Sequence, residues 1–359
     1  MKIKQIRVSK KDLRLTRPYT IAYKTISAVE NGIIELVSDS GVTGLGSLNP
    51  VVEVTGETLE QALGALGADG LGWLEGRRID TIEEFKAIIK TIRQKTSASS
   101  SARAGLEMAL YDLFTQSLDL PLVKFLGQKI RRMPTSVTIG IKDMADTLLE
   151  AKEYTGRGFK ILKIKLGVSP EADLERLTKL REVYGNKIGL IVDINQGYNL
   201  QQLLTFCDKV KNMYIPLIEQ PLKAGQEATM QQLPRPVKRL LAADESLLTP
   251  RDALKLAESP AACGFFNIKL MKCGGITEAL EIAAIAARSG IGLMWGCNDE
   301  SRISIAAALH TAFSCSQTRY IDLDGSFDLA EDVVAGGFIL KDGMMSLRDK
   351  PGLGLEKAF

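Results

Sequence analysis

Three carboxylate side chains in the middle of the chain each follow a short apolar run. They are Asp193, Glu219 and Asp244, after residues 188–192, 215–218 and 240–243. If these runs are neighbouring strands, the carboxylates lie at one level and repel one another unless a cation is present. Oxygen ligands without histidine or cysteine indicate a hard divalent ion, so we expect Mg²⁺ with positions open for substrate oxygens. The alternative is that each carboxylate is a separate, solvated loop residue. That explanation is plausible for one carboxylate but poor for three in succession.

Lysines end two other apolar runs. Lys163 and Lys165 stand two residues apart in 161–166, so the strand period places both on one face. Like charges disfavour the protonated form, so we expect the pair to lower each other's pKa and make one lysine usable as a base. A K-x-K on an exposed edge strand is the alternative, and the neighbouring carboxylates argue against it. Lys269 also points inward, whereas Lys272 is expected to face solvent.

These side chains together suit proton transfer next to a carbonyl group. A carboxylate or amide oxygen on Mg²⁺ makes the neighbouring α-C–H more acidic, because the metal stabilises the charge that moves onto oxygen. One lysine would remove the proton and the other would return it to the opposite face. We therefore expect inversion of a stereocentre, whereas a single base with a leaving group would give elimination.

The single histidine removes several other chemistries. His310 lies in the apolar, helix-like segment 306–313, where we expect a core or helix-end residue. Ser-His-Asp and Cys-His arrangements could use only this residue, and zinc sites with several histidines are impossible. The five cysteines show no C-x-x-C spacing, so we expect reduced thiols rather than a disulfide scaffold or a thiolate metal cage.

The composition argues against nucleic-acid and membrane partners. The 359 residues include 46 basic and 43 acidic side chains, and the net charge of +3 is too balanced for binding a phosphate backbone or an anionic lipid surface. The N-terminus is charged without an apolar segment behind it, and no long apolar run follows. We expect a cytoplasmic protein with neither kind of partner.

After about residue 134, short apolar strands alternate with amphipathic helices, which is typical of βα units around a parallel sheet. Strand ends are expected near Ile139, Lys165, Asp193, Glu219, Asp244, Lys269, Cys297 and Asp322. From Lys165 onward they advance by 28, 26, 25, 25, 28 and 25 residues, which is one strand, one helix and two loops. Eight units predict a (β/α)₈ barrel with Lys165 and Lys269 on opposite sides of its mouth. A doubly wound open sheet is the alternative.

The rest of the chain is expected to build a smaller domain on this barrel. Residues 1–130 combine an alternating, antiparallel pattern with helices and predict an α+β capping domain. Residues 131–330 would form the catalytic barrel. Residues 331–359 contain two more strand patterns, at 337–340 and 344–347, and are expected to return to the N-terminal sheet.

The ordered motifs resemble the enolase superfamily, in its muconate-lactonizing-enzyme subgroup, and within it the dipeptide epimerases, typified by L-Ala-D/L-Glu epimerases. The similarity covers essentially the whole length. It rests on segments 102–113 and 121–127, followed in order by K-x-K, Asp, Glu-Gln-Pro, Asp-Glu-Ser and Asn-x-Lys-x-x-Lys-x-Gly-Gly. Enolase-type sites that pair a lysine base with Mg²⁺ are one of the known patterns of acid–base tuning.

The resemblance implies a role for each polar residue. Lys165 and Lys269 would be the paired bases, and Lys163 would contact the substrate carboxylate or enolate. The magnesium ligands would be Asp193, Glu219 and Asp244. Asp322 and Asp324 would bind the α-ammonium group of a dipeptide, and strand alternation agrees, since it places both on one face. Alone, Asp-Leu-Asp-Gly is more often a turn signal.

The resemblance also places substrate-contacting positions. The N-terminal loop 17–25 carries Lys24 where Ala-Glu epimerases carry an arginine, so the fork that suits a glutamate carboxylate is lost. Thr138, Cys297 and Asp299 match other contact positions, and Asp299 disfavours an acidic side chain. We therefore expect epimerisation of L-Ala-L-Xaa dipeptides with a broad or hydrophobic second residue, by two-base transfer through a metal-stabilised enolate.

Several alternatives stay open from the sequence. They are an L-Ala-D/L-Glu epimerase of peptidoglycan-peptide salvage, a muconate cycloisomerase, an o-succinylbenzoate synthase, a Schiff-base aldolase and a non-catalytic binding protein. The cycloisomerase and synthase reactions need no ammonium-binding pair. The expected partners are a small dipeptide substrate and further copies of the chain in a homo-oligomer.

Overall fold

The computed structural model describes residues 1–21, 24–67 and 71–357, with the side chains of 18–21 and 24–26 outside that description. Its larger part is an eight-stranded parallel sheet in the order β12-β11-β10-β9-β8-β7-β6-β5. The strands are β5 (Ser136–Ile139), β6 (Ile161–Lys165), β7 (Gly189–Asp193), β8 (Ile218–Glu219), β9 (Leu241–Ala243), β10 (Phe265–Ile268), β11 (Gly292–Trp295) and β12 (Thr318–Ile321). A parallel bridge from Thr135 to Ile321 joins the two ends of this order. The predicted barrel is confirmed.

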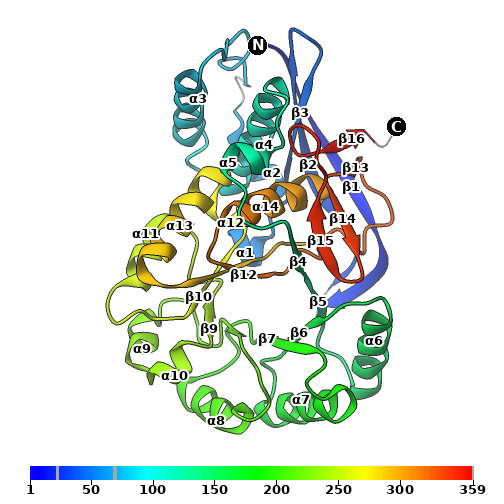
Figure 1. Cartoon of the computed structure of the whole chain (residues 1–359), viewed down its shortest axis with the longest axis vertical. Helices are drawn as coiled ribbons and strands as arrows, with labels where there is room; N and C mark the ends of the chain where they lie inside the picture. Colours follow the sequence, from blue (N-terminus) through cyan, green and yellow to red (C-terminus); the bar gives the residue numbers. More distant parts are fainter. Residues whose placement is uncertain (22–23, 68–70, 358–359) are drawn as a thin grey trace.

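Helices surround the strands (Figure 1). They are α6 (Met144–Gly156), α7 (Pro170–Tyr184), α8 (Leu200–Val210), α9 (Glu227–Gln232), α10 (Arg235–Lys238), α11 (Pro250–Ala257), α13 (Ile276–Ser289) and α14 (Arg302–Ser314). The strand period separates two layers, because alternate side chains face the helices and the interior. A small apolar cluster, Ile191, Leu217, Ala242 and Met294, is separate from the main core. Ile191, Leu217 and Ala242 each stand two residues before a polar strand end, so they share the interior face with the polar residues.

The capping domain packs an antiparallel sheet on helices. Its strands are β1 (Ile3–Ile21), β2 (Lys24–Ser38) and β3 (Thr43–Leu48), and its helices are α1 (Val52–Thr55), α2 (Leu59–Ala65), α3 (Ile82–Lys95), α4 (Ser100–Ser117) and α5 (Leu122–Leu126). Ser99 caps α4, because its side chain accepts the Ala102 N–H. β3 lies so close to α4 that a Cβ atom at Gly46 would stand 1.8 Å from the Gly105 carbonyl oxygen. Only glycine permits this contact.

The C-terminal strands do not pair with the N-terminal sheet as the sequence predicts. β14 (Phe338–Lys341) pairs with β15 (Met344–Leu347), and β15 pairs with β4 (Arg132–Pro134) rather than with the N-terminal sheet. β13 (Val334–Gly336) pairs with β16 (Leu355–Lys357). The expectation of a shared sheet is therefore wrong, because β15 forms its backbone hydrogen bonds with β14 and β4. The segment still contacts the capping domain, since Asp112 of α4 accepts the N–H groups of Leu45 and Leu353, each at 2.8 Å.

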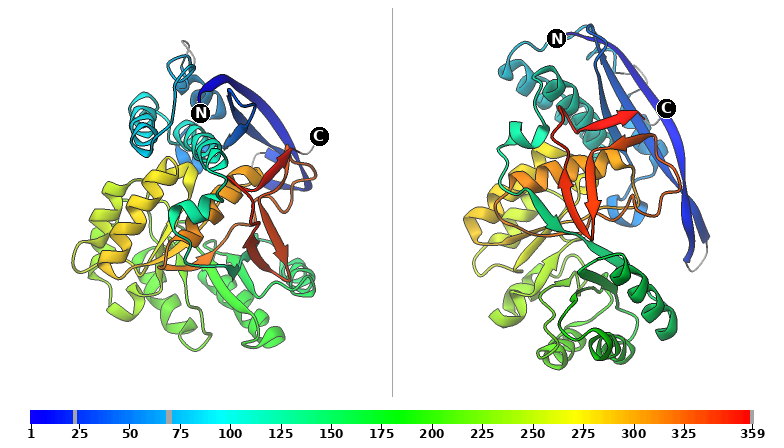
Figure 2. Two further views of the ribbon diagram at one scale, coloured as in Figure 1. Left: turned by 45° about the horizontal axis from the view of Figure 1, so that its top comes forward. Right: turned by 45° about the vertical axis from the view of Figure 1, so that its right-hand side comes forward.

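The hairpin of β1 and β2 extends from the capping domain alongside the barrel (Figure 2). Thr16 N–H donates to the Asp328 carbonyl at 2.7 Å, just after the last barrel strand. Arg17 forms an ion pair with Glu153 of α6 at 2.5 Å. The hairpin therefore contacts the barrel after β12 and at α6.

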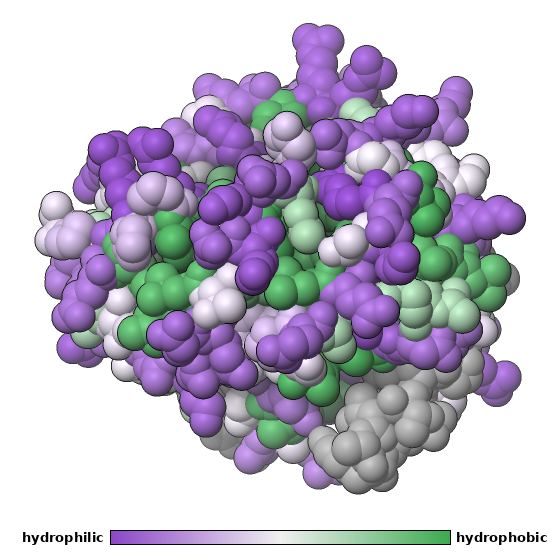
Figure 3. Space-filling model, turned by 90° about the horizontal axis from the view of Figure 1, so that it is seen from below, coloured by the Kyte–Doolittle hydropathy of each residue, from purple (hydrophilic) through white to green (hydrophobic). Residues whose placement is uncertain are grey.

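The face seen from below in Figure 3 carries many hydrophilic side chains with hydrophobic ones between them. The exposed hydrophobic side chains of the chain include Val183 of α7 and Leu200 of α8. Across the part of the chain that the structure describes, no helix combines the length and apolar character needed to cross a membrane.

His310 is a core residue of α14, as the sequence predicts. It is fully buried, its Nδ1 accepts the Val123 N–H at 2.9 Å, and its Nε2 lies 3.4 Å from the Leu353 carbonyl oxygen. Burial lowers its pKa to about 3. The residue therefore joins α14 to α5 and to the C-terminal segment as a neutral ring.

We expect the stability of the protein to fall more steeply than that of a His310→Gln variant between about pH 6.5 and about pH 5. The unfolded chain binds a proton at this histidine near pH 6.5, whereas the folded chain does not until about pH 3, so acid favours unfolding. The difference amounts to about 2 kcal/mol at pH 5. Thermal melting of both proteins across this range measures it, and parallel curves would contradict it. The chain has one histidine, so the difference reports this residue.

Candidate active site

The charged side chains singled out in the sequence meet at the carboxyl ends of the barrel strands. They are Lys163 and Lys165 in β6, Asp193 and Glu219 at the ends of β7 and β8, Asp244 and Lys269 directly after β9 and β10, and Asp322 and Asp324 after β12. Lys165 pairs in register with Asp193, and Asp193 with Glu219. Lys165, Asp193 and Glu219 therefore stand at one level of the barrel.

Lys163 lies at the centre of this group. Its Nζ atom is 2.8 Å from Glu219 Oε2 and from Asp322 Oδ2, and 3.1 Å from Asp193 Oδ2. Its side chain is 4% exposed. One ammonium group thus connects carboxylates from three strands.

Lys165 and Lys269 stand on strands that lie four positions apart in the ring of eight. Lys165 Nζ is 2.7 Å from Asp193 Oδ2 and 2.9 Å from Asn195 Oδ1. Lys269 Nζ is 2.9 Å from Asp244 Oδ2. Their side chains are 31% and 10% exposed, so Lys165 is the more accessible amine.

The carboxylates reverse the pKa shift that the sequence predicts for Lys163. Burial alone would lower the pKa of Lys163, but Asp322, Glu219 and Asp193 together raise it well above its ordinary value. Burial likewise opposes a raised pKa at Lys269, which its carboxylate neighbours nevertheless produce. The prediction that the pKa of Lys163 is lowered is therefore wrong, because attraction by the carboxylates outweighs the repulsion between lysines.

The site offers an oxygen-only donor set, which suits a hard divalent cation. Glu219 is fully buried, and burial followed by the charge of Asp193 raises its pKa to about 8. Its Oε2 lies near Lys163 without hydrogen-bond geometry, and the buried Oε2 of Glu245 also accepts no hydrogen bond. Within residues 1–21, 24–67 and 71–357, no acidic, histidine or cysteine side chains are already gathered as a metal-binding group. Lysine ammonium groups lie between these carboxylates instead. The carboxylate oxygens fit Mg²⁺ once an ammonium group moves away from them.

Two polar residues of the β10 segment escaped the sequence reasoning. Lys272 is not solvent-facing as expected, because its side chain is 1% exposed and its ammonium group contacts Asp244. Asn267 Nδ2 donates to Glu219 Oε1 at 2.8 Å. Period 2 could have found Asn267, which shares a face with Lys269, but the helical turn α12 (Leu270–Cys273) breaks this period before Lys272.

The other side of the site holds the D-x-D pair. Asp322 accepts the Ser136 hydroxyl at 2.5 Å and pairs with Lys163, so its charge is already compensated. Asp324 Oδ2 accepts the Thr138 N–H at 2.8 Å, and burial followed by the charge of Asp322 raises its pKa to about 7. A cation beside Asp324 would favour the ionised form. The two aspartates therefore differ, although the sequence predicts one shared role.

The remaining predicted contact residues border this pair. Cys297 Sγ lies 3.9 Å from Asp324 Oδ1 and 3.3 Å from the Asp322 carbonyl oxygen, and Asp299 is half-buried in the loop that follows. The backbone of Lys24 begins β2, but its side chain lies outside the described part of the chain.

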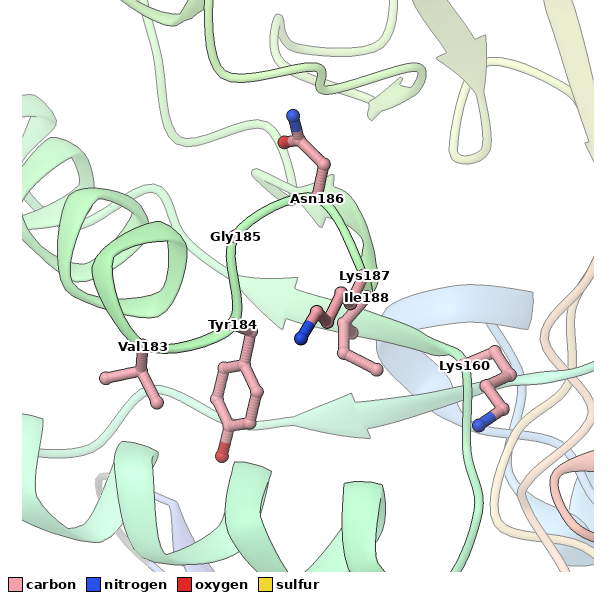
Figure 4. A pocket seen from close by; sticks show the side chains of 7 residues that line it. All are labelled: Lys160, Val183, Tyr184, Gly185, Asn186, Lys187 and Ile188. Carbon is pink, nitrogen blue, oxygen red and sulfur yellow. The ribbon is translucent and has the colours of Figure 1, made fainter.

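A surface hollow of about 640 Å³ lies at the other end of the barrel strands. Its lining includes Lys160, which precedes β6, and Lys187 and Ile188, which precede β7 (Figure 4). The charged cluster instead occupies the carboxyl ends of the same strands, where barrel enzymes place their chemistry.

Comparison with known proteins agrees with this arrangement. Residues 3–127 match the mandelate racemase / muconate lactonizing enzyme N-terminal domain, and residues 146–358 match the enolase C-terminal domain-like family. An L-Lys-D/L-Arg epimerase from Methylococcus capsulatus is 51% identical over 355 residues, which are 99% of both chains. An L-Ala-D/L-Glu epimerase from Clostridium acetobutylicum is 33% identical over 99% of both.

A solved structure gives the same result. The dipeptide epimerase of Methylococcus capsulatus, in complex with Mg and the dipeptide L-Arg-D-Lys, superposes with a TM-score of 0.95 at 51% identity, and the match covers 99% of both chains. The chain therefore belongs to the enolase superfamily, in its mandelate racemase and muconate-lactonizing-enzyme group.

Proposed function

We propose that the chain is a magnesium-dependent dipeptide epimerase that inverts the α-carbon of the C-terminal residue by two-base proton transfer. One observation carries the proposal. Lys165 and Lys269 stand on strands at opposite sides of the ring, and the strands between them bring the carboxylates of Asp193, Glu219 and Asp244. The isomerase class also agrees with the names of the relatives.

The two lysines would act on opposite faces of the substrate's α-carbon, one as the base and the other as the acid. With its amine neutral, Lys165 would take the α-proton from one face, and Lys269 in its ammonium form would supply a proton to the opposite face. Asp193, Glu219 and Asp244 would hold Mg²⁺, which would supply positive charge to stabilise the charge that develops on the substrate oxygen. When the two lysines exchange their roles as acid and base, the reaction inverts the α-carbon in the opposite direction.

The D-x-D pair would orient the dipeptide. Asp324 is half-buried and lacks the lysine contact that neutralises Asp322, so the substrate's α-ammonium group would supply the charge it needs. Binding of the N-terminus there would direct the C-terminal residue toward the lysines. This need for a cation separates an epimerase from a muconate cycloisomerase or an o-succinylbenzoate synthase.

We propose basic dipeptides as the first substrate class. The relative at 51% identity is named an L-Lys-D/L-Arg epimerase, and the solved complex holds L-Arg-D-Lys. Asp299 brings negative charge to one side of the mouth, which favours cationic over anionic side chains. A homo-oligomer stays a prediction.

L-Ala-L-Xaa dipeptides with neutral or hydrophobic second residues are the second candidate. The L-Ala-D/L-Glu epimerase at 33% identity supports alanine at the first position. Lys24 in place of an arginine, together with Asp299, argues against glutamate at the second position. A Schiff-base aldolase would instead require a carbonyl substrate that borohydride traps on Lys165.

A dipeptide library in D₂O with Mg²⁺ tests the reaction directly. We expect deuterium at the α-carbon of the C-terminal residue, with Lys- and Arg-containing dipeptides exchanging faster than L-Ala-L-Xaa dipeptides. Mass spectrometry with fragmentation locates the label. Exchange confined to the N-terminal residue would contradict the placement of the ammonium group, and no exchange in any dipeptide would contradict the epimerase.

Single lysine variants test the assignment of the two bases. We expect Lys165→Ala and Lys269→Ala each to lower epimerisation by about 10²- to 10⁴-fold, the usual contribution of a positioned acid or base. Each variant should still exchange the α-proton of one stereoisomer, because the remaining lysine serves one face. NMR of the L,L and L,D dipeptides in D₂O measures this, and loss of the same stereoisomer in both variants would count against opposed faces.

Removal of the metal tests the carboxylate site. After treatment with EDTA we expect no measurable exchange, with full recovery on adding Mg²⁺, because the α-proton is too weakly acidic without the ion. The rate of deuterium incorporation before and after addition is the measurement. Unchanged exchange in the chelated protein would show that the carboxylates serve another purpose.

A further inference from the structure

The ammonium group of Lys272 is the most completely enclosed amine of the site. It contacts Asp244 Oδ1, lies 2.6 Å from the Asp244 backbone oxygen, and lies 3.2 Å from the Asn267 carbonyl oxygen. An ammonium group has three N–H donors, so these three oxygens satisfy all of them. A buried lysine bonded in this way has no donor left for a substrate.

Asp244 is fixed from two sides. Its backbone N–H donates to Gln220 Oε1 at 2.9 Å, while Lys272 binds its backbone oxygen and its Oδ1 atom. Its Oδ2 atom lies 2.9 Å from Lys269 Nζ. Oδ2 is therefore the oxygen that faces the reacting side of the site, and Oδ1 faces Lys272.

The turn that carries Lys272 is itself held in place. Lys269 accepts the N–H groups of Lys272 and Cys273 at 3.0 and 3.1 Å, so the two lysines belong to one hydrogen-bonded turn. Gly275 follows with φ of 120°, and a Cβ atom there would stand 2.8 Å from Glu107 Oε2 of the capping domain. Glu107 accepts the Thr277 N–H at 3.0 Å. Helix α4, which carries Glu107, thus contacts the segment that directly follows the turn.

We infer that Lys272 is a positioning residue for the metal site: it fixes the Asp244 carboxylate through Oδ1, so that Oδ2 is presented to the ion. The inference rests on the proposed function, in which Asp244 is a magnesium ligand. It also assigns proton transfer to Lys269 rather than to Lys272, because every donor of Lys272 is occupied. Groups that orient metal ligands typically change metal affinity by about 10- to 100-fold when they are removed.

The test measures binding of Mn²⁺ alone, by electron paramagnetic resonance of the free ion, in the full-length protein. Lys272→Met removes the donors and keeps the length of the side chain. We expect the Kd for Mn²⁺ to rise about 10-fold or more. Loss of a nearby positive charge would by itself tighten Mn²⁺ binding, so weaker binding reports lost positioning rather than lost charge.

Lys238→Met is the matched control, because Lys238 Nζ also bonds a backbone oxygen, that of Gln231 at 2.8 Å, outside the site. We expect it to bind Mn²⁺ as the unchanged protein does. Lys272→Gln, which keeps two N–H donors, is the second variant if Lys272→Met does not fold, and it should also weaken Mn²⁺ binding.

Deuterium exchange with the L,L and L,D dipeptides separates the roles further. A positioning residue should lower exchange of both stereoisomers by the same factor in Lys272→Met, with Mn²⁺ binding weakened. Unchanged or tighter Mn²⁺ binding, or loss of exchange in one stereoisomer only, would overturn the inference. If the unchanged protein binds Mn²⁺ but exchanges no dipeptide, the proposed function fails while the effect of Lys272 is still measured. No Mn²⁺ binding by the unchanged protein overturns both.

Discussion

Carboxylates buried at the mouth of a barrel are stable in the ionised form only where positive charge lies next to them. Asp193, Glu219, Asp244 and Asp322 meet this constraint through Lys163, Lys165, Lys269 and Lys272. The constraint accounts for the burial of Lys163, Lys269 and Lys272. It also accounts for the raised pKa of Lys163 and of Lys269, which burial alone would lower. A divalent cation can therefore bind these carboxylates only where it displaces a lysine ammonium group. Metal binding and the release of that lysine from its carboxylate are thus linked.

The four lysines divide by how tightly they are held. Lys163 and Lys272 are almost inaccessible and each contact three oxygens, which suits a fixed role in the site. Lys165 is the most exposed of the four, and Lys269 has contact with a single carboxylate. Amines that must collect and release a proton need this freedom. The distribution of contacts therefore agrees with the pair that we propose as the bases.

The sequence predicted the barrel because its signal is local and repeated. Apolar strands that end in a polar residue every 25 to 28 positions locate Asp193, Glu219, Asp244 and Lys269 within one residue of a strand end. The same local reasoning failed for Lys272, because a single helical turn changes the side-chain direction after β10. It also failed for the sign of the Lys163 pKa shift, since that sign depends on carboxylates from three other strands. The pairing of β15 with β4 likewise depends on which edge lies nearby in the folded chain.

Diffraction from crystals soaked with Mn²⁺ and an L-Lys-L-Arg dipeptide tests the central claim most directly, because anomalous scattering locates the ion independently of its ligands. The account predicts one Mn²⁺ bound by oxygens of Asp193, Glu219 and Asp244, with the amines of Lys165 and Lys269 on opposite faces of the C-terminal α-carbon. An ion bound elsewhere, or both amines on the same face of that carbon, would contradict it.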